Sequence, residues 1–379
     1  MRVAIDASEL GGRPTGVGRY LRELIARWTR MPACDGSQLL LYAPFEAPAT
    51  LDHSSGPGAR TTWRVVGGAR GTLWQQRDLA RAVRADAVDV FFAPAYTAPL
   101  RLACPTVASI HDVSFAARPE WYAWTHGLRL RLLARLSARR ARAVLTLTRF
   151  SAAEITGHLG VSADRIHVVP LAVDYLDAPP VPQAPAAAVP VVLFVGSIFE
   201  RRHLPLLIEA TALARRRIPG LQLDVIGENR TSPRQDLERI AHDAGAADVL
   251  RLRDYVSDAD LAAAYASASV FAFLSEYEGF GLTPLEAMRG GLPAIVLDTP
   301  VAREVYGAAA TYVPLGDAQA VADALTRLVE DPVERAARIA AGDALVAGYK
   351  WNDAARRTWD VVVAAGGQST GRRDVETPA

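Results

Sequence analysis

The sequence predicts an α/β protein with two domains, each built on a parallel sheet. Three observations support this fold class. Short apolar runs typical of buried strands alternate with segments of helical period along most of the chain. The run from Val3 to Ile5 leads into the glycine-rich segment 11–20 and then into a helical pattern, which is how a nucleotide-fold unit opens. The proline-rich segment 177–190 divides the alternation in two.

The composition is that of an ordinary globular protein, with 379 residues, a net charge of +1 and 50% hydrophobic residues. This charge gives no reason to expect a nucleic-acid partner. Cys34 and Cys104 are too few for a disulfide framework or a zinc site, and they fit a reducing compartment. The first residues enter a strand pattern without a leader, and the longest apolar runs are shorter than the roughly 20 residues that span a bilayer. We therefore expect a cytoplasmic protein, at most peripheral at the inner face of the cell membrane.

The same pattern predicts the domain boundaries. We expect an N-terminal Rossmann-like domain at 1–176, the linker at 177–190 and a C-terminal Rossmann-like domain at 191–347. A helix at 348–365 would cross back to the first domain, and a polar tail at 366–379 would be disordered. Strands are expected at 3–5, 39–42, 63–66, 88–92, 106–110, 143–148, 191–195, 221–226, 249–252, 269–274 and 293–297. The main helices between them are expected at 72–84, 126–142, 204–217, 233–244, 261–268, 318–328 and 334–345.

Segment 275–290, SEYEGFGLTPLEAMRG, has the pattern of a strand end, a glycine loop and a helix start. Thr283 is predicted to be the N-cap of that helix, Pro284 its first residue and Glu286 the partner in a capping box. A helix N-terminus presents unpaired N–H groups and the positive end of a dipole, so it favours a phosphate ligand. The alternative is that Glu286 is only a cap and that Glu278 is a solvated loop residue.

The run E-G-F-G-L-T-P-L-E-A-M, with seven residues between its glutamates, resembles the donor-site signature of retaining GT-B glycosyltransferases of family GT4, or group 1. It is most similar to O-antigen and polysaccharide mannosyltransferases. This resemblance implies two Rossmann-like domains that face each other across a cleft. It also implies that Glu278 contacts the transferred sugar and that Glu286 holds the ribose. The loop backbone would meet the sugar and the diphosphate through Gly279, Phe280, Gly281, Leu282 and Thr283.

Segment 194–210, FVGSIFERRHLPLLIEA, resembles the family block that binds the donor diphosphate. Arg202 stands where that block usually has lysine, and Ser197 stands where many relatives have a second arginine. We expect Arg202 to bind the diphosphate and Arg201 to compensate for Ser197, because a guanidinium is always charged and offers paired donors to phosphate oxygens.

Two segments of the N-terminal half add candidates. The family's GxGRY segment implies that Gly16 and Val17 lie near the donor diphosphate, with Arg19 near the acceptor. No third glycine completes a dinucleotide fingerprint there, so an oxidoreductase is disfavoured. The strand at 106–110 ends in His111 and Asp112, within a segment that resembles the family's His-Asp block, where the histidine lies beside the transferred sugar. Asp112 either orients His111 or hydrogen-bonds the loop, and a purely structural histidine is the alternative.

Residues 253–257 stand where relatives cradle the nucleobase, so Tyr255 and Val256 are candidate base contacts. The D-A-D triplet at 258–260 suggests a metal clamp. However, Ser257 with Asp260 three residues later explains the acids as a helix cap, and no metal site is predicted.

The segment 126–142 carries many arginines and no acid. Leu128, Leu132, Leu133 and Leu136 form an apolar stripe, and Arg131, Arg135, Arg139 and Arg142 are expected to share one face. Such a helix either contacts an anionic membrane or an anionic acceptor, or is simply a solvated face.

Taken together, these resembling segments imply that the protein transfers a hexose with retention. The product would be an α-glycoside in cell-surface polysaccharide or glycolipid synthesis. The expected donor is GDP-mannose, with UDP-glucose close behind, and the acceptor is a glycan or a lipid-linked glycan. No cofactor is expected besides the donor substrate. A nucleotide-sugar epimerase and a non-catalytic nucleotide-sugar-binding subunit remain as alternatives.

Overall fold

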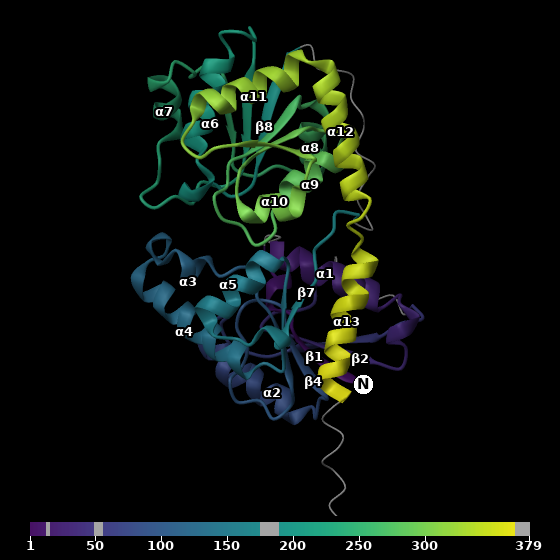
Figure 1. Ribbon diagram of the computed structural model, residues 1–379. Coiled ribbons are helices and arrows are strands. Elements are labelled where there is room, and N and C mark those ends of the chain that lie inside the picture. The colour runs from purple at the N-terminus through teal and green to yellow at the C-terminus, as the bar shows by residue number, and fades with distance from the viewer. Residues whose placement is uncertain (13–15, 49–55, 175–188, 368–379) are drawn as a thin grey trace, which may run out of the picture. The chain divides into compact units, whose positions relative to one another are not determined.

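The structure is a computed structural model that describes residues 1–12, 16–48, 56–174 and 189–367 (Figure 1). Its contacts divide the chain into two compact units. Unit 1 comprises Met1–Leu171 with Lys350–Ala379, and unit 2 comprises Ala172–Tyr349. The predicted linker at 177–190 and tail at 366–379 lie almost wholly outside the described residues. Within the described ranges, no helix combines the length and apolar character that crossing a bilayer requires.

Unit 1 contains a seven-stranded sheet in the order β3-β2-β1-β4-β5-β6-β7, and every pair in it is parallel. The central strands are apolar along their whole length because helices cover both faces of the sheet. The strands are β1 (Arg2–Asp6), β2 (Gln38–Ala43), β3 (Arg60–Val65), β4 (Val90–Ala93), β5 (Thr106–Ser109), β6 (Ala143–Thr146) and β7 (Ile166–Val168).

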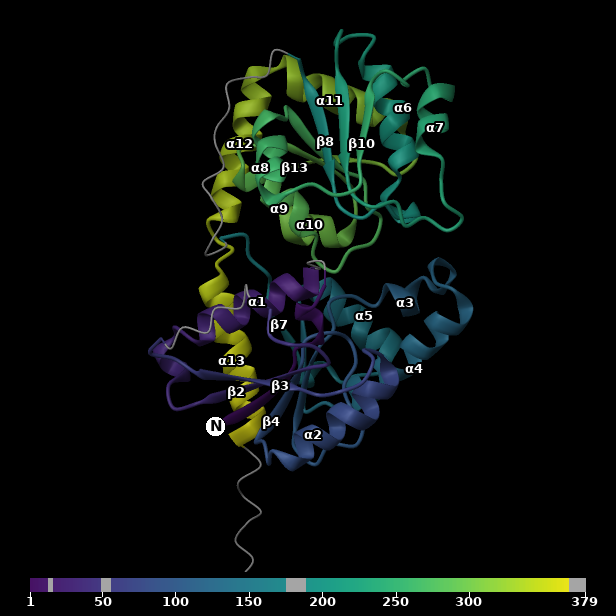
Figure 2. The ribbon, with the colours of Figure 1, turned by 180° about the vertical axis from the view of Figure 1, so that it is seen from behind.

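The helices of unit 1 include a π-helical turn at Trp74–Leu79 that continues into α2. The helix α13 comes from the C-terminal end of the chain and packs beside α1 and over β4, β5 and β6 (Figures 1 and 2). Trp28 anchors this contact, since its indole N–H donates to the Ala355 carbonyl oxygen at 2.9 Å. The helices are α1 (Gly16–Trp28), α2 (Ala80–Ala85), α3 (Ser114–Ala117), α4 (Trp124–Arg140), α5 (Arg149–Leu159) and α13 (Trp351–Gly367).

Unit 2 contains a six-stranded parallel sheet in the order β10-β9-β8-β11-β12-β13. Its strands are β8 (Val191–Val195), β9 (Gln222–Ile226), β10 (Leu250–Arg253), β11 (Val270–Phe273), β12 (Ala294–Leu297) and β13 (Ala310–Val313). Its helices are α6 (Leu204–Ala214), α7 (Leu237–Asp243), α8 (Asp258–Ser267), α9 (Leu282–Arg289), α10 (Pro300–Tyr306), α11 (Ala318–Glu330) and α12 (Pro332–Val346).

Several predicted elements need correction. The edge strands β7 and β13 were not predicted because each is only three or four residues long. The helix α1 begins at Gly16, so the glycine pair of the predicted loop lies in the first helical turns. The helix α7 begins at Leu237 and not near residue 233, because the Asp236 side chain caps it by accepting from the Arg239 N–H.

Both sheets reverse their strand order between two central neighbours, β1 and β4 in unit 1 and β8 and β11 in unit 2. In open parallel sheets, ligands bind beyond the carboxyl ends of the strands at such a switch point. The segments that leave β8 and β11 are 196–202 and 275–281, and the topology places them next to each other. The fold thus juxtaposes two of the segments predicted to bind the donor.

The carboxyl ends of β8 and β9 approach each other through glycines. Gly227 has φ 156°, and a Cβ atom there would lie 2.0 Å from the Gly196 carbonyl oxygen. We expect Gly227→Ala to lower the free energy of unfolding by about 1–3 kcal/mol, because backbone must shift to remove the overlap. Urea denaturation would measure the loss, with Gly245→Ala as the control, since Gly245 also has positive φ (69°) but open space around its Cβ position. Equal losses in the two variants would contradict a specific contact at Gly227.

Candidate active site

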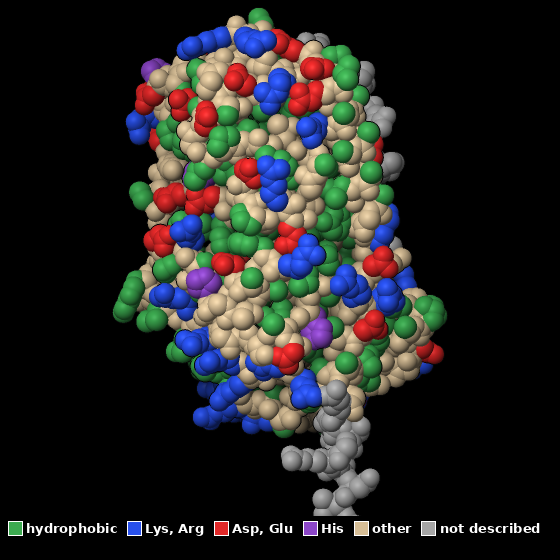
Figure 3. Space-filling model, in the orientation of Figure 1, with side chains coloured by type: hydrophobic (Ala, Val, Ile, Leu, Met, Phe, Trp, Pro, Cys, Tyr) green, Lys and Arg blue, Asp and Glu red, His purple; other side chains and the backbone are tan. Residues whose placement is uncertain are grey.

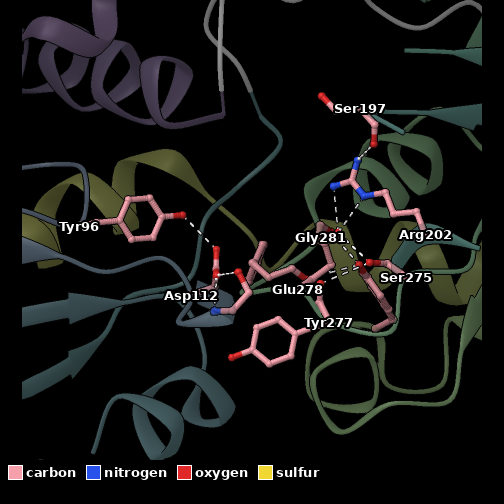
Figure 4. Close-up of polar contacts among 11 residues, drawn as sticks. Tyr96, Asp112, Ser197, Arg202, Ser275, Tyr277, Glu278 and Gly281 are labelled. Atoms are coloured by element: carbon pink, nitrogen blue, oxygen red, sulfur yellow. Dashed lines mark hydrogen bonds and ion pairs between the residues drawn. The ribbon is translucent and has the colours of Figure 1, made fainter. Parts of the chain in front are cut away.

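The centre of the site in unit 2 is an ion pair between Arg202 and Glu278 (Figure 4). Arg202 donates to Glu278 Oε1 from Nε at 3.1 Å and from Nη2 at 2.9 Å. Its Nη1 donates to the Ser197 carbonyl oxygen at 2.7 Å, so all three guanidinium nitrogens are engaged. The two side chains are 13% and 20% exposed, which leaves the pair accessible at the end of the sheet.

The neighbours of this pair fix its geometry. Ser275 Oγ donates to Glu278 Oε1 at 2.9 Å, whereas no described residue makes a hydrogen bond or ion pair with Oε2. The Arg202 guanidinium lies over the Phe273 ring at 4.8 Å from the centroid, and Gly196 leaves room for it, since a Cβ there would be 2.6 Å from Nη1. Arg202 is therefore held in place by contacts on several sides, and Oε2 can still accept a hydrogen bond.

Arg201, the other predicted phosphate ligand, lies against the same aromatic ring as Arg202. Its guanidinium lies over the Phe199 ring, 4.3 Å from the centroid. Its carbonyl oxygen accepts from the Glu276 N–H at 3.0 Å, which ties the 3-10 turn Glu200–Arg202 to the loop after β11. His203 Nε2 and Glu276 Oε2, 2.7 Å apart, reinforce that tie. The turn that carries both arginines is thus tied to the loop that carries Glu278.

The prediction that Thr283 caps the helix is wrong. The helix α9 begins at Leu282, and its N-cap is Gly281 in a left-handed conformation with φ 84°. Tyr306 explains this, because its hydroxyl donates to the Gly281 carbonyl oxygen at 2.8 Å and would lie 2.0 Å from a Cβ at Gly281. Thr283 Oγ1 is buried and has no hydrogen-bond partner among the described residues. The first N–H groups of α9 lack partners within the helix and can meet an anion.

Gly279 and Phe280 lie in the loop between β11 and α9, and the Phe280 ring packs edge-on against Tyr349 at 5.4 Å. Glu286 lies on the second turn of α9, where the Tyr265 hydroxyl donates to its Oε2 over 3.4 Å. Glu278 and Glu286 therefore belong to one loop-helix segment, as the motif requires. The motif gave no role to Ser275, and no sequence signal identified Tyr265 on α8 or Tyr306 on α10, which contact this segment.

The two candidate base contacts are at least partly exposed. Tyr255 is 63% exposed and Val256 is half-buried. A pocket of about 370 Å³ lies beside them, but its wall contains the preceding residues Leu252 and Asp254 together with Gly227, Asn229 and Arg234. Leu252, rather than Tyr255, thus lines this pocket, together with the apolar side chains of Ile198 and Leu237. The helix cap predicted at 257–260 is confirmed, since Ser257 Oγ accepts from the Asp260 N–H at 3.1 Å.

In unit 1, His111 follows β5 and is buried between Tyr20 and Tyr96, whose ring centroids lie 5.0 and 5.7 Å away. Its Nε2 lies 2.8 Å from the Pro94 carbonyl oxygen. A carbonyl can only accept, so the proton is on Nε2 and Nδ1 is left as an acceptor. Burial lowers the pKa of His111, although the Pro94 carbonyl and Asp112 oppose that shift. The ring is therefore neutral at pH 7.

This pKa shift predicts a pH dependence of stability. Because the folded-state pKa lies below the ordinary value of 6.5, the unfolded state binds the proton more readily. The stabilisation is complete above pH 6.5 and is lost as the pH falls toward the folded-state pKa. We expect the unfolding free energy to fall below pH 6.5 by up to about 1.4 kcal/mol per pH unit more in the wild type than in His111→Gln. Denaturant titrations across pH would measure this, and parallel curves would contradict it.

Asp112 does not orient His111 through a hydrogen bond. Its Oδ2 accepts from the Tyr96 hydroxyl at 3.0 Å, and its Oδ1 accepts from the Ser114 N–H at 2.8 Å (Figure 4). Asp112 therefore holds the loop around His111, which was the second of its two predicted roles. Gly16, Val17 and Arg19 lie in the first turns of α1, and Tyr20 Oη, one residue on, lies 3.2 Å from Ser109 Oγ.

Comparisons with known proteins agree with this arrangement. The family model for glycosyl transferases group 1 matches residues 182–344, and that for glycosyltransferase family 4 matches residues 14–175. Between them they match most of the chain. The chain belongs to the group 1 glycosyltransferases. It is therefore an enzyme of the hexosyltransferase class.

The relatives and solved structures extend this assignment. The chain is 27% identical over 370 residues to O-antigen chain mannosyltransferase B of Escherichia coli, covering 91% of this chain and 94% of that protein. It superimposes on sucrose-phosphate synthase from Thermosynechococcus elongatus with a TM-score of 0.76 at 18% identity, over 97% and 99% of the two chains. Anabaena HepE in complex with UDP and glucose gives a TM-score of 0.70 at 19% identity, over 96% and 100%. The predicted GT-B fold, with two parallel-sheet α/β domains, is confirmed.

Proposed function

We propose that this glycosyltransferase moves mannose from GDP-mannose to a glycan or lipid-linked glycan, with retention, in the synthesis of a cell-surface polysaccharide or glycolipid. The observation that carries the proposal is the Arg202–Glu278 pair at the β8/β11 switch point, directly before the N-terminus of α9. A guanidinium and a helix N-terminus suit a diphosphate, and a carboxylate with one open oxygen suits sugar hydroxyls.

The reaction follows from these roles. The bond between the anomeric carbon and the diphosphate oxygen breaks, and the acceptor oxygen bonds to that carbon from the same face. The acceptor proton passes to the departing phosphate oxygen. Arg202, Arg201 and the amides from Gly279 to Thr283 offset the charge that develops on the diphosphate, so the site supplies this stabilisation without requiring a metal.

The remaining candidates have binding roles in this proposal. Glu278 Oε2 accepts from the sugar hydroxyls, and Glu286 holds the ribose diol. The neutral His111 offers Nδ1 as an acceptor to the same sugar. Gly16 and Val17 in the first turn of α1 meet the diphosphate, and Arg19 belongs to the acceptor side. The segment from Leu252 to Val256 contacts the base.

Mannose is favoured because O-antigen chain mannosyltransferase B matches nearly the whole chain. UDP-glucose is the second candidate, since the structurally similar HepE binds UDP and glucose. We place the reaction in the cytoplasm, at the inner face of the cell membrane, where a lipid-linked acceptor would be available.

Product analysis tests this function. The purified enzyme would be incubated with GDP-mannose or UDP-glucose, with and without a lipid-linked oligosaccharide, and the products would be identified by NMR. We expect an α-glycoside from one donor only in the presence of acceptor. A changed sugar without acceptor would indicate an epimerase instead. Donor binding with neither transfer nor hydrolysis would indicate a non-catalytic binding subunit.

A further inference from the structure

The loop that follows β4 contains a strained turn at Tyr96. Its φ is 56°, a left-handed value that residues other than glycine rarely adopt. The Thr97 N–H donates to the Ala95 carbonyl oxygen across Tyr96, as in a γ-turn with positive φ, which is a rare and strained turn. The Tyr96 N–H donates to the Ser109 carbonyl oxygen at 2.9 Å, which fastens the turn to the end of β5. A strained turn of this kind persists only where its surroundings hold it.

Two glutamines of the π-helical turn before α2 hold the far side of this turn. Gln75 Nε2 donates to the Thr97 carbonyl oxygen at 3.1 Å, and Gln75 Oε1 accepts from Thr97 Oγ1 at 2.9 Å. Gln76 Nε2 donates to the Ala98 carbonyl oxygen at 2.9 Å. Gln75 Nε2 also donates to Asp6 Oδ2 at 3.1 Å, at the end of β1. The π-helical turn thus binds the backbone of the loop, and π-helical turns are frequent at functional sites.

The helix α4 supports the same loop from its buried face. Ser137 Oγ, on that face, accepts from the Ala98 N–H at 3.0 Å. The other face of α4 is exposed and basic, and Figure 3 shows Lys and Arg side chains gathered on this lower-left part of unit 1. Arg142, predicted to share that face, lies beyond the end of the helix at Arg140. The loop after β4 is therefore held by several elements of unit 1 at once.

The position of this loop determines the contacts of His111. The Pro94 carbonyl oxygen, two residues before Tyr96, meets His111 Nε2, and the Tyr96 ring packs edge-on against the imidazole. The Tyr96 hydroxyl donates to Asp112, the residue after His111 (Figure 4). A rotation of φ at Tyr96 to a negative value would turn Pro94 relative to Thr97. The Pro94 carbonyl could then not stay on His111 while Thr97 stays on the glutamines.

We propose that Tyr96 is a positioning residue for His111. Its left-handed turn keeps the Pro94 carbonyl oxygen on Nε2, which fixes the proton there and leaves Nδ1 as the acceptor for the transferred sugar. The proposal deepens the proposed function and rests on the contact of His111 with that sugar. A turn with a purely structural role would affect stability but not the tautomer of His111.

Two variants of similar size separate the turn from the tyrosine ring. Tyr96→Asn and Tyr96→Val both remove the ring and the hydroxyl, but asparagine tolerates positive φ and the β-branched valine does not. The tautomer would be read at pH 7 from the ¹⁵N chemical shifts of the imidazole nitrogens in the full chain, with His111→Gln to identify the signals. We expect the wild type and Tyr96→Asn to carry the proton on Nε2, and Tyr96→Val to show a mixture of both tautomers.

The same variants should differ in transfer. We expect Tyr96→Val to lower kcat about 10- to 100-fold with a smaller change in the KM for the donor, because a displaced His111 affects the reacting geometry more than binding. Tyr96→Asn should stay within about threefold of the wild type. Ala87→Val is the matched control, since Ala87 also has positive φ (46°) but is exposed and precedes β4. It should change neither the tautomer of His111 nor kcat.

Equal losses in Tyr96→Val and Tyr96→Asn would overturn the proposal, because they would assign the effect to the ring. An unchanged tautomer in Tyr96→Val would also overturn it, and so would a changed tautomer with unchanged kcat. If Tyr96→Val does not fold, Tyr96→Ala replaces it, since alanine also disfavours positive φ but has no β-branch. If the wild type transfers no sugar, the proposed function fails, whereas the tautomer comparison still tests the role of Tyr96.

Discussion

Glu278→Ala should reduce glycosyl transfer on the order of 10³-fold while nucleotide binding survives. In the proposed reaction Glu278 contacts the transferred sugar, so its loss affects the transition state more than the ground state. Removing the carboxylate also frees Arg202, which at present donates two hydrogen bonds to it. Steady-state transfer rates and calorimetric titration with the nucleoside diphosphate would measure the two effects.

Glu276→Ala is the matched control, because it removes the same charge from the same loop, where Glu276 pairs with His203. It should retain transfer within about threefold, as a partly exposed ion pair contributes little. Glu286→Ala should show the opposite pattern to Glu278→Ala and weaken nucleotide binding, since Glu286 is proposed to hold the ribose. Equal activity in Glu278→Ala and the wild type would refute the assigned roles.

Arg202→Ala should weaken binding of the nucleoside diphosphate about 10- to 100-fold. A hydrogen bond from a charged group contributes about 1.5–3 kcal/mol, and Arg202 is the cation that the loop after β8 fixes beside the helix terminus. Arg202→Lys should recover only part of the affinity, because an ammonium group does not reproduce the paired donors. Calorimetric titration of the three proteins with the same nucleotide gives the comparison.

The double variant Arg202→Ala/Glu278→Ala separates two possible causes of the weaker nucleotide binding in Arg202→Ala. In the single variant, Glu278 keeps its charge without Arg202 and would repel the diphosphate. If repulsion explains the whole loss, the double variant will bind as tightly as the wild type. We expect it to stay at least about tenfold weaker, because the attraction of the guanidinium is gone. Full recovery would contradict direct contact between Arg202 and the phosphates.

Much of this fold could be predicted from sequence because buried parallel strands are apolar along their whole length. The alternation of such runs with helices identified every central strand of both sheets. The missed strands β7 and β13 lie at sheet edges and carry only a few residues each. Short edge strands give too little periodic pattern to be distinguished from a loop.

The sequence motifs identified the residues of the donor site, but they did not predict that Arg202 and Glu278 form an ion pair. Arg202 and Glu278 are 76 residues apart, and only the strand order brings the ends of β8 and β11 together. The error at Thr283 has a similar origin. A threonine before a proline suggests an N-cap, but Tyr306 on α10 stabilises Gly281 in the left-handed conformation and starts the helix earlier. Tertiary contacts therefore determine both the Arg202–Glu278 ion pair and the first residue of α9.

The helix α4 shows a limit of hydrophobic patterns. Its leucines and its small residues both recur at helical spacing, and the sequence alone does not decide which set is buried. The structure buries four small residues and exposes Leu128 and Leu132, while the other leucines of the helix are half-buried. Which of two candidate faces is buried depends on the surface that the helix meets, and the sequence of the helix does not contain that surface.

The most direct test of the account is calorimetric titration of the wild-type enzyme with GDP, UDP and ADP, each with and without magnesium. We expect one of the three to bind without magnesium, with GDP as the first candidate. That result would support a donor site built from Arg202, the loop amides and the N-terminus of α9, and would limit the donors to sugars carried on that base. Binding that requires magnesium, or no binding at all, would contradict it.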